Sequence, residues 1–212
     1  MRPFWKRGEA QPSTSVPSRD IIQHFNDAAA DEEHFPSTID PRIYHVQLIR
    51  EHLGDINGLR ILDVGSGKGR FARVLHDEFP GSSICAFDLA EAMLRFVPKG
   101  IAACAGSMTA LPFASSRFDG AYATESLEHA IDIETAVNEM CRVVKPGGRI
   151  VIIDKNAEHW GRLRTPEWEK WFHRNELERL LKRHCRLVTS QPISYWEDVA
   201  PDGLFLAWLA TK

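Results

Sequence analysis

The stretch ILDVGSGKGR, residues 61–70, places three glycines at alternate positions directly after an apolar run that contains an aspartate. Without a Cβ, each glycine lets the backbone lie close to a bulky ligand. Asp63, which precedes the glycines, can attract a cationic ammonium group. Asp88 ends the next apolar run, where a carboxylate can accept hydrogen bonds from both hydroxyls of a ribose. The pattern therefore predicts a site for a nucleoside-containing ligand.

Three such ligands compete for a glycine-rich loop of this kind. A nucleoside triphosphate requires GxxxxGK followed by Ser or Thr, but Lys68 is followed by Gly69 and position 62 is leucine. A dinucleotide requires GxGxxG, whose third glycine lets helix and strand pack closely, and here that position holds the bulky Arg70. The spacing therefore favours the third ligand, an adenosyl cofactor without phosphates.

A second group of residues with possible chemistry is ESLEH, residues 125–129. In a helix, Glu125, Glu128 and His129 would lie on one face. Two carboxylates and an imidazole can bind a divalent cation such as Mg²⁺, which would lower the pKa of a bound hydroxyl, and His159 could supply a fourth ligand. Two alternatives stay open, namely that His129 is a general base without a metal and that the segment is purely structural.

The order of the predicted elements indicates a single α/β sheet that gathers these residues at one edge. Short apolar runs alternate with segments whose apolar residues recur at helical spacing, which is typical of a doubly wound, mostly parallel sheet. In such a sheet ligands bind at the carboxyl ends of the strands. Helices are expected over 19–30, 41–53, 71–79, 90–97, 132–144 and 166–183, and strands over 59–64, 84–88, 101–106, 118–124, 149–154, 185–190 and 203–212.

Five segments in order resemble the motifs of the class I S-adenosylmethionine-dependent methyltransferases, in particular the small single-domain group called methyltransferase type 11. They are ILDVGSGKG, FDLAEAML, GSMTALPF, FDGAYATESLEH and RVVKPGGRIVIID. The resemblance runs from about residue 19 to the last residue, and the order and spacing of the motifs make it specific. It implies a Rossmann-like, seven-stranded, mostly parallel sheet with an antiparallel last strand, and an N-terminal helical cap.

The resemblance also implies which residues bind S-adenosyl-L-methionine. Asp63, Gly65 and Gly67 would hold the methionine end of the cofactor. Asp88 would bind the ribose, and Leu89 would lie beside the adenine. Ser107 stands where many relatives carry an aspartate, so we expect the adenine to be bound less tightly. The backbone of Met108 can contribute to binding the adenine. The implied cofactor residues are Asp63, Gly65, Ser66, Gly67, Asp88, Leu89, Ser107, Met108 and Thr124. ExxEH is also similar to the magnesium site of ubiquinone-biosynthesis and small-RNA 2′-O-methyltransferases.

Length and composition predict one domain and limit its partners. We expect a flexible tail over residues 1–18 and one domain over 19–212. In this domain, lid helices (19–53) close over the site, with Phe25 and Tyr44 as candidate lid residues.

With 26 basic and 29 acidic side chains and no cationic block, a nucleic acid is not the expected partner. The absence of an apolar run of about 20 residues disfavours a membrane span. Four cysteines without a CxxC pair, and no signal-peptide core, favour a cytoplasmic protein.

The segment over residues 158–177 is rich in tryptophan and would cover the acceptor pocket. Its Trp168, Trp171 and Phe172 recur at helical spacing, which more often indicates core packing than substrate stacking. The sequence carries no signal for the identity of the acceptor or for the oligomeric state.

The predicted function is methyl transfer from S-adenosylmethionine to a small molecule, at a hydroxyl oxygen and with possible metal assistance. Four alternatives remain: C- or N-methylation without a metal, an inactive nucleotide-fold binding protein, an NAD-dependent oxidoreductase and an RNA methyltransferase. Arg70 disfavours the oxidoreductase, and the acidic net charge of −3 disfavours the RNA substrate.

Overall fold

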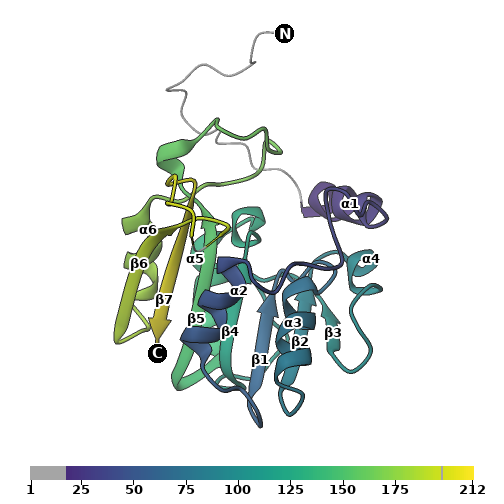
Figure 1. Ribbon diagram of the computed structural model, residues 1–212, viewed down its shortest axis with the longest axis vertical. Coiled ribbons are helices and arrows are strands. Elements are labelled where there is room, and N and C mark those ends of the chain that lie inside the picture. The colour runs from purple at the N-terminus through teal and green to yellow at the C-terminus, as the bar shows by residue number, and fades with distance from the viewer. Residues whose placement is uncertain (1–17, 197) are drawn as a thin grey trace.

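The computed structural model describes residues 18–196 and 198–212, so nearly all of the predicted tail, residues 1–18, lies outside the described residues. The described chain forms a seven-stranded sheet in the order β3-β2-β1-β4-β5-β7-β6 (Figure 1). Strands β1 to β5 run parallel, and β7 runs antiparallel to both of its neighbours. This confirms the predicted fold class. The strands are β1 Arg60–Val64, β2 Ser83–Asp88, β3 Ala102–Ala105, β4 Phe118–Thr124, β5 Val144–Lys155, β6 Leu187–Ile193 and β7 Phe205–Thr211.

Helices cover both faces of the sheet, and within the described residues none is long and apolar enough to cross a membrane. They are α1 Ser18–Ala28, α2 Tyr44–Leu53, α3 Arg70–Glu78, α4 Glu91–Leu94, α5 Ile133–Val143 and α6 Arg174–Leu181, with short 3₁₀ turns η1 Leu127–His129 and η2 Ala157–His159.

The alternation of side chains along β5 explains why this strand holds the two layers together. Ile150 and Ile152 point into the core that contains α5 and α6, whereas Val151 and Ile153 point into the core that contains α2 and α3. All four are fully buried. A strand buried on both faces reads as a continuous apolar run, which is why RIVIID was recognisable in the sequence.

The structure differs from the sequence analysis at one expected helix and at ESLEH, which was considered as a helix. The helix expected over 166–183 begins only at Arg174, because the residues before it run beside the end of β5, where the Phe172 amide donates to the Lys155 carbonyl at 3.0 Å. Trp171 and Phe172 are buried there, so their core role is confirmed although their spacing is not helical. In ESLEH only Leu127–His129 is helical, as the single turn η1, and Glu125 has a φ of +49°.

The predicted N-terminal cap divides into two parts. Helix α2 lies against the sheet, with its buried Val46, Ile49 and Leu53 in the same core as α3. Helix α1 instead stands beyond the ends of the strands, next to α4 (Figure 1). Only α1 and the segment after it are therefore placed as a lid.

The glycines between β1 and α3 are needed for different structural reasons. Gly65 and Gly67 both have positive φ, at +73° and +53°. A Cβ on Gly65 would lie 2.3 Å from the Cβ of Ser126, whose hydroxyl donates to the Val64 carbonyl at 2.8 Å. A Cβ on Gly67 would meet no atom within 4 Å. Gly65 is therefore required by contact with the protein itself, and only Gly67 leaves space for a ligand.

We expect Gly65→Ala to lower the free energy of unfolding by roughly 2–5 kcal/mol, because left-handed strain of about 1–2 kcal/mol adds to an overpacking cost of about 1–3 kcal/mol. Gly67→Ala should be destabilised only by the left-handed strain, which is about 1–2 kcal/mol. In a double-mutant cycle measured by urea unfolding, Gly65→Ala should cost less in a Ser126→Gly background, where the colliding Cβ is absent. Equal losses for the two glycine variants would contradict this assignment.

Candidate active site

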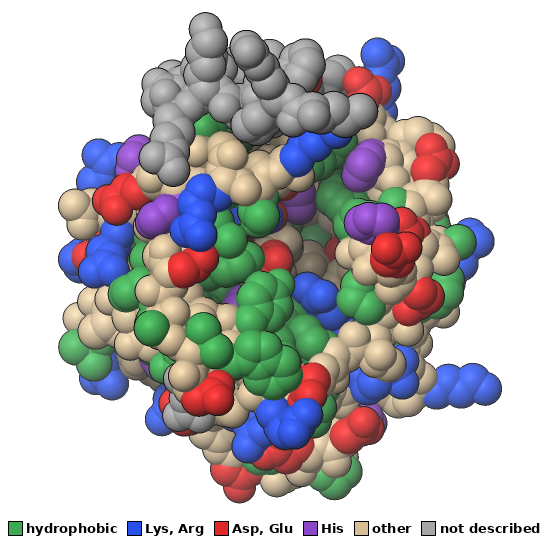
Figure 2. All heavy atoms as spheres, turned by 45° about the horizontal axis from the view of Figure 1, so that its top comes forward, with side chains coloured by type: hydrophobic (Ala, Val, Ile, Leu, Met, Phe, Trp, Pro, Cys, Tyr) green, Lys and Arg blue, Asp and Glu red, His purple; other side chains and the backbone are tan. Residues whose placement is uncertain are grey.

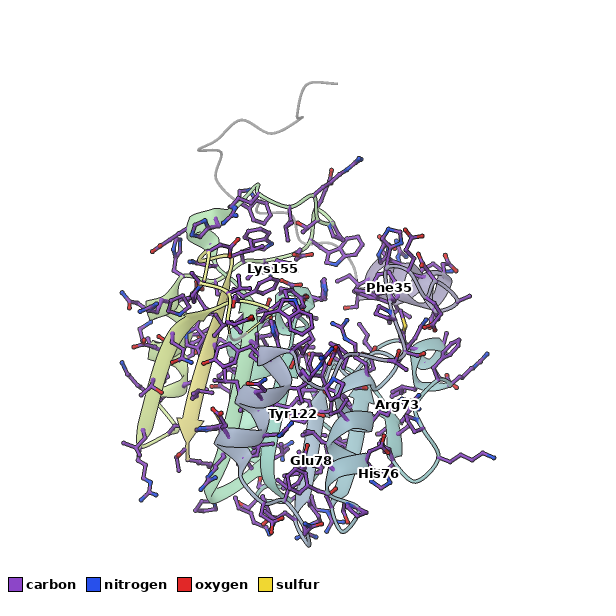
Figure 3. The ribbon with its side chains drawn as sticks, viewed as in Figure 1. Phe35, Arg73, His76, Glu78, Tyr122 and Lys155 are labelled. Carbon is purple, nitrogen blue, oxygen red and sulfur yellow. The ribbon has the colours of Figure 1, made fainter. Side chains whose placement is uncertain are left out.

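A cavity of about 480 Å³ opens at the carboxyl ends of the parallel strands. Its volume is in the range typical of small-molecule sites. Figure 2 shows the molecule hollowed here, with hydrophobic, acidic and basic side chains inside the hollow. Lys155, at the end of β5, and Phe35, after α1, lie on opposite sides of this space (Figure 3). Every predicted cofactor residue lines the cavity, together with Glu125, Glu128 and His129, whereas His159 does not.

Asp88 occupies a fixed position at one side of the cavity. Its carboxylate accepts hydrogen bonds from the backbone amides of Gly67, at 2.7 Å, and Ala90, at 2.8 Å. Burial raises the pKa of Asp88 above its usual value, and these backbone bonds oppose the rise. Ser107, the departure from the family pattern, bonds through its hydroxyl to Thr109 at 2.7 Å. These groups form the side of the cavity where a ribose and an adenine would lie.

Asp63 fits a cationic ligand group. Its side chain is buried, and one carboxylate oxygen has no hydrogen-bond partner among the described residues. Burial raises the pKa of Asp63 to about 7, because the ionised carboxylate is removed from water. An ammonium group in the cavity would stabilise the ionised form, so the residues present fit the amino end of S-adenosylmethionine.

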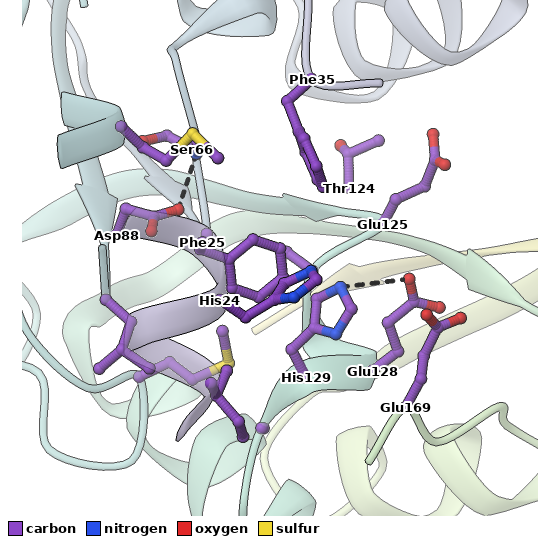
Figure 4. A pocket seen from close by; sticks show the side chains of 18 of the residues that line it. His24, Phe25, Phe35, Ser66, Asp88, Thr124, Glu125, Glu128, His129 and Glu169 are labelled. Atoms are coloured by element: carbon purple, nitrogen blue, oxygen red, sulfur yellow. Dashed lines mark hydrogen bonds and ion pairs between the residues drawn. The ribbon is translucent and has the colours of Figure 1, made fainter. Parts of the chain in front are cut away.

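Helix α1 and the segment after it cover the cavity. The Phe25 ring meets the His129 ring edge to face, with centroids 4.9 Å apart (Figure 4). The buried Lys68 ties the glycine loop to this cover, because its ammonium donates to the Asp31 carbonyl at 3.0 Å and to Glu32 at 2.6 Å. Tyr44, the other lid candidate, does not line the cavity and bonds through its amide to the Tyr195 carbonyl.

A buried cluster of charged residues forms the opposite wall. The Lys155 ammonium pairs with Glu128 and, at 2.9 Å, with Glu169. Asp154 lies beneath the pair and accepts from the amides of Glu128, at 3.2 Å, and Lys155, at 2.9 Å. Burial disfavours the charged lysine, but the three carboxylates outweigh it and raise the pKa of Lys155. Burial, assisted by Asp154, raises the pKa of Glu128 well above its usual value.

The structure does not assemble the predicted metal set. Glu125 turns away from Glu128 (Figure 4). Its carboxylate accepts a hydrogen bond from the Tyr195 hydroxyl at 3.0 Å. His159 lies outside the cavity, beside Gly203. The prediction of one helical face was wrong because Glu125 adopts a left-handed conformation before a single 3₁₀ turn.

A different group, Glu128, His129 and Glu169, brings its possible ligand atoms within 4.8 Å of one another in the described part of the chain. The Lys155 ammonium already bonds both carboxylates of this group. A divalent ion would have to displace a buried lysine, so these residues do not fit a resident metal.

His129 is held as a neutral imidazole. Burial, reinforced by the charge of Lys155, lowers the pKa of His129 to about 3. Its Nε2 lies 3.6 Å from a Glu128 oxygen, and its buried Nδ1 has no hydrogen-bond partner among the described residues. A neutral ring with an unused nitrogen at the cavity wall can accept a hydrogen bond from a ligand hydroxyl.

Two residues of this wall were not found in the sequence. Lys155 directly follows the apolar strand RIVIID, and its position at a strand end was a usable signal. Glu169 lies in the tryptophan-rich segment, which lines the cavity through Leu163, Arg164 and Glu169. No periodicity marks Glu169, because the residues around it are neither helix nor strand.

We expect the affinity for S-adenosylhomocysteine to rise with pH up to about 7, because the ammonium of the ligand requires ionised Asp63, whose pKa of about 7 must fall on binding. The gain should be at most about tenfold for each pH unit. Calorimetric titrations between pH 5.5 and pH 7 measure it, with Asp63→Asn as the control that binds weakly at every pH. If the affinity changes with pH equally in the wild type and in Asp63→Asn, the proton that is lost on binding comes from another group.

The sequence profile of the family described as "Methyltransferase domain", type 11, matches residues 62–152. A demethylmenaquinone methyltransferase of Renibacterium salmoninarum is 33% identical over 152 residues, which cover 70% of this chain and 61% of that protein. An O-methyltransferase of Aspergillus nomiae is 38% identical over 114 residues, covering 50% of this chain and 51% of that protein. The chain thus spans only about half to six-tenths of the length of these relatives.

Among solved structures, the [4+2]-cyclase SpnF superimposes with a TM-score of 0.76 at 17% identity, covering 96% of this chain and 99% of that one. At this identity the superposition concerns the fold alone. The family profile covers the end of the strand β1, the glycine loop, Asp88 and the turn η1, and each of these contributes residues to the lining of the cavity. Residues 62–152 therefore form a methyltransferase domain of type 11, which is the domain of the class I S-adenosylmethionine-dependent methyltransferases.

Proposed function

We propose that this protein transfers the methyl group of S-adenosylmethionine to a hydroxyl oxygen of a small molecule. The observation that carries the proposal is that one cavity is lined by Asp63, by Asp88 and by His129, whose Nδ1 has no hydrogen-bond partner among the described residues. The first two residues suit the ammonium and ribose of the cofactor, and His129 suits the hydroxyl of an acceptor. The names of the relatives, which include an O-methyltransferase, support the same class of reaction.

When bound, the cofactor supplies a methyl group activated by a sulfonium for in-line displacement. The protein's share is alignment, exclusion of water and removal of the hydroxyl proton. Asp63 holds the ammonium of the cofactor and Asp88 holds its ribose. Phe25, from the lid, covers His129. His129 holds the acceptor hydroxyl by a hydrogen bond to Nδ1 and takes its proton as the oxygen gains the methyl group, because the oxygen becomes strongly acidic in that step.

The reaction that we propose uses no metal. Lys155 supplies the positive charge that a cation would bring to Glu128 and Glu169. The Mg²⁺ expected from the ExxEH pattern would have to compete with this intramolecular ammonium for Glu128. C- or N-methylation remains the alternative, because it would need no change in any of the cofactor residues.

We expect S-adenosylhomocysteine to bind at one site, and His129→Ala to lower methyl transfer about 10²–10⁴-fold while its affinity for S-adenosylhomocysteine stays unchanged. The reason is that His129 acts on the acceptor and not on the cofactor. Transfer of labelled methyl to a panel of phenols and acidic carbon compounds measures the rate, and calorimetry measures the affinity. Failure of S-adenosylhomocysteine to bind would support an inactive binding protein, and full activity of the variant would remove His129 from the mechanism.

We expect titration of Mg²⁺ or Mn²⁺ into protein saturated with S-adenosylhomocysteine to give no heat of binding, and EDTA to leave methyl transfer unchanged. Lys155 is the physical reason, since it occupies the carboxylates that the ion needs. A heat of binding that disappears in Glu128→Gln would establish a metal site and overturn the metal-free mechanism.

A further inference from the structure

A second cavity, of about 400 Å³, adjoins the first. It lies between the end of β5 and residues 194–204, which connect β6 to β7. Glu125, Lys155 and Leu163 line both cavities, so the two spaces share a wall. Nothing in the mechanism above uses this second space.

The lining of the second cavity is mainly apolar. Tyr195, Trp196, Val199, Leu204 and Phe205 contribute side chains to it. Trp196 is 42% exposed and Val199 is 51% exposed, although both are large apolar residues. Apolar groups that remain exposed together beside a reaction site indicate a binding surface.

The connection that carries these residues is held in place by specific contacts. The Ser194 hydroxyl bonds to the Val199 carbonyl at 2.7 Å, which closes the loop on itself. The Tyr195 ring packs against His45, with centroids 4.6 Å apart, and against Phe205, at 5.4 Å. These contacts tie the described residues Ser194, Tyr195 and Val199 to one another and to β7.

Glu125 stands at the shared wall in a conformation that non-glycine residues rarely adopt, with φ at +49°. Such a conformation persists only where the surroundings hold it, and it is enriched at functional sites. Here the Tyr195 hydroxyl donates to Glu125 at 3.0 Å, and Arg70 lies 3.6 Å away on the cofactor side. Glu125 thus links the second cavity to the glycine loop.

The charged groups of the second cavity already have partners. Glu125 pairs with Arg70, Lys155 pairs with Glu128 and Glu169, and Asp202 pairs with Arg162 at 2.8 Å. A charged ligand group would therefore find no unpaired counter-charge among these residues. The lining suits an uncharged, apolar group.

We propose that the second cavity binds an apolar chain or ring of the methyl acceptor, while the acceptor's hydroxyl reaches His129 past the shared wall. This inference rests on the proposed function. It defines the acceptor class as a molecule with a hydroxyl-bearing head and an uncharged apolar extension. Trp196 and Val199 are the residues that determine specificity for the extension.

The test uses para-alkylphenols with ethyl, butyl and hexyl chains, titrated calorimetrically into the full chain saturated with S-adenosylhomocysteine. Each added methylene should tighten binding about fourfold until the cavity is filled. In Val199→Asp this dependence on chain length should disappear while the affinity for unsubstituted phenol persists. Leu187→Asp is the matched control, because Leu187 is 61% exposed but begins β6 at the opposite end of the sheet.

The outcomes separate the inference from the function on which it rests. If S-adenosylhomocysteine does not bind, the proposed function fails. If it binds but phenol affinity is independent of chain length, or if Leu187→Asp has the same effect as Val199→Asp, the second cavity is not the site of the extension. If Val199→Asp changes the mass in sedimentation and leaves the chain-length dependence intact, the surface joins two copies of the chain and the inference is overturned.

Discussion

The acceptor side of the site depends on one buried interaction, the pairing of the Lys155 ammonium with Glu128 and Glu169. These residues come from the end of β5, from the turn after β4 and from the tryptophan-rich segment. Removing one partner from a buried ion pair leaves an uncompensated charge, which is strongly destabilising. The pairing therefore fixes three separate segments relative to one another and determines the shape of the wall that faces the cofactor residues.

The same interaction divides the chemical roles. Because the lysine holds the acidic side chains, they are not free to ligate an ion. Because the lysine also places a positive charge near His129, it helps keep that imidazole neutral. A neutral imidazole can take a proton from a hydroxyl, whereas an imidazolium cannot. The cluster thus keeps His129 a hydrogen-bond acceptor and lowers its basicity, so that it can take a proton only from a group that has become strongly acidic.

The parts of the molecule that the sequence predicted are those encoded by local patterns. Asp63 and Asp88 follow from apolar runs with polar ends, and the seven strands follow from the same runs. The parts that could not be predicted depend on distant contacts. Ser126 makes Gly65 necessary, and Tyr195 and Arg70 hold Glu125 away from Glu128. A short motif such as ExxEH specifies a helical face only if its backbone is helical, and here long-range contacts determine the backbone.

This division has a consequence for substrate choice. The cofactor half is formed by one loop and two strand ends, which leave little freedom for change without loss of cofactor binding. The acceptor half that we propose is formed by η1, the tryptophan-rich segment and the connection from β6 to β7. Substitutions at Trp196 or Val199 can alter what is bound without disturbing Asp63 or Asp88. One fold can therefore keep its methyl donor and accept different molecules, because the two cavities share only Glu125, Lys155 and Leu163 among their lining residues.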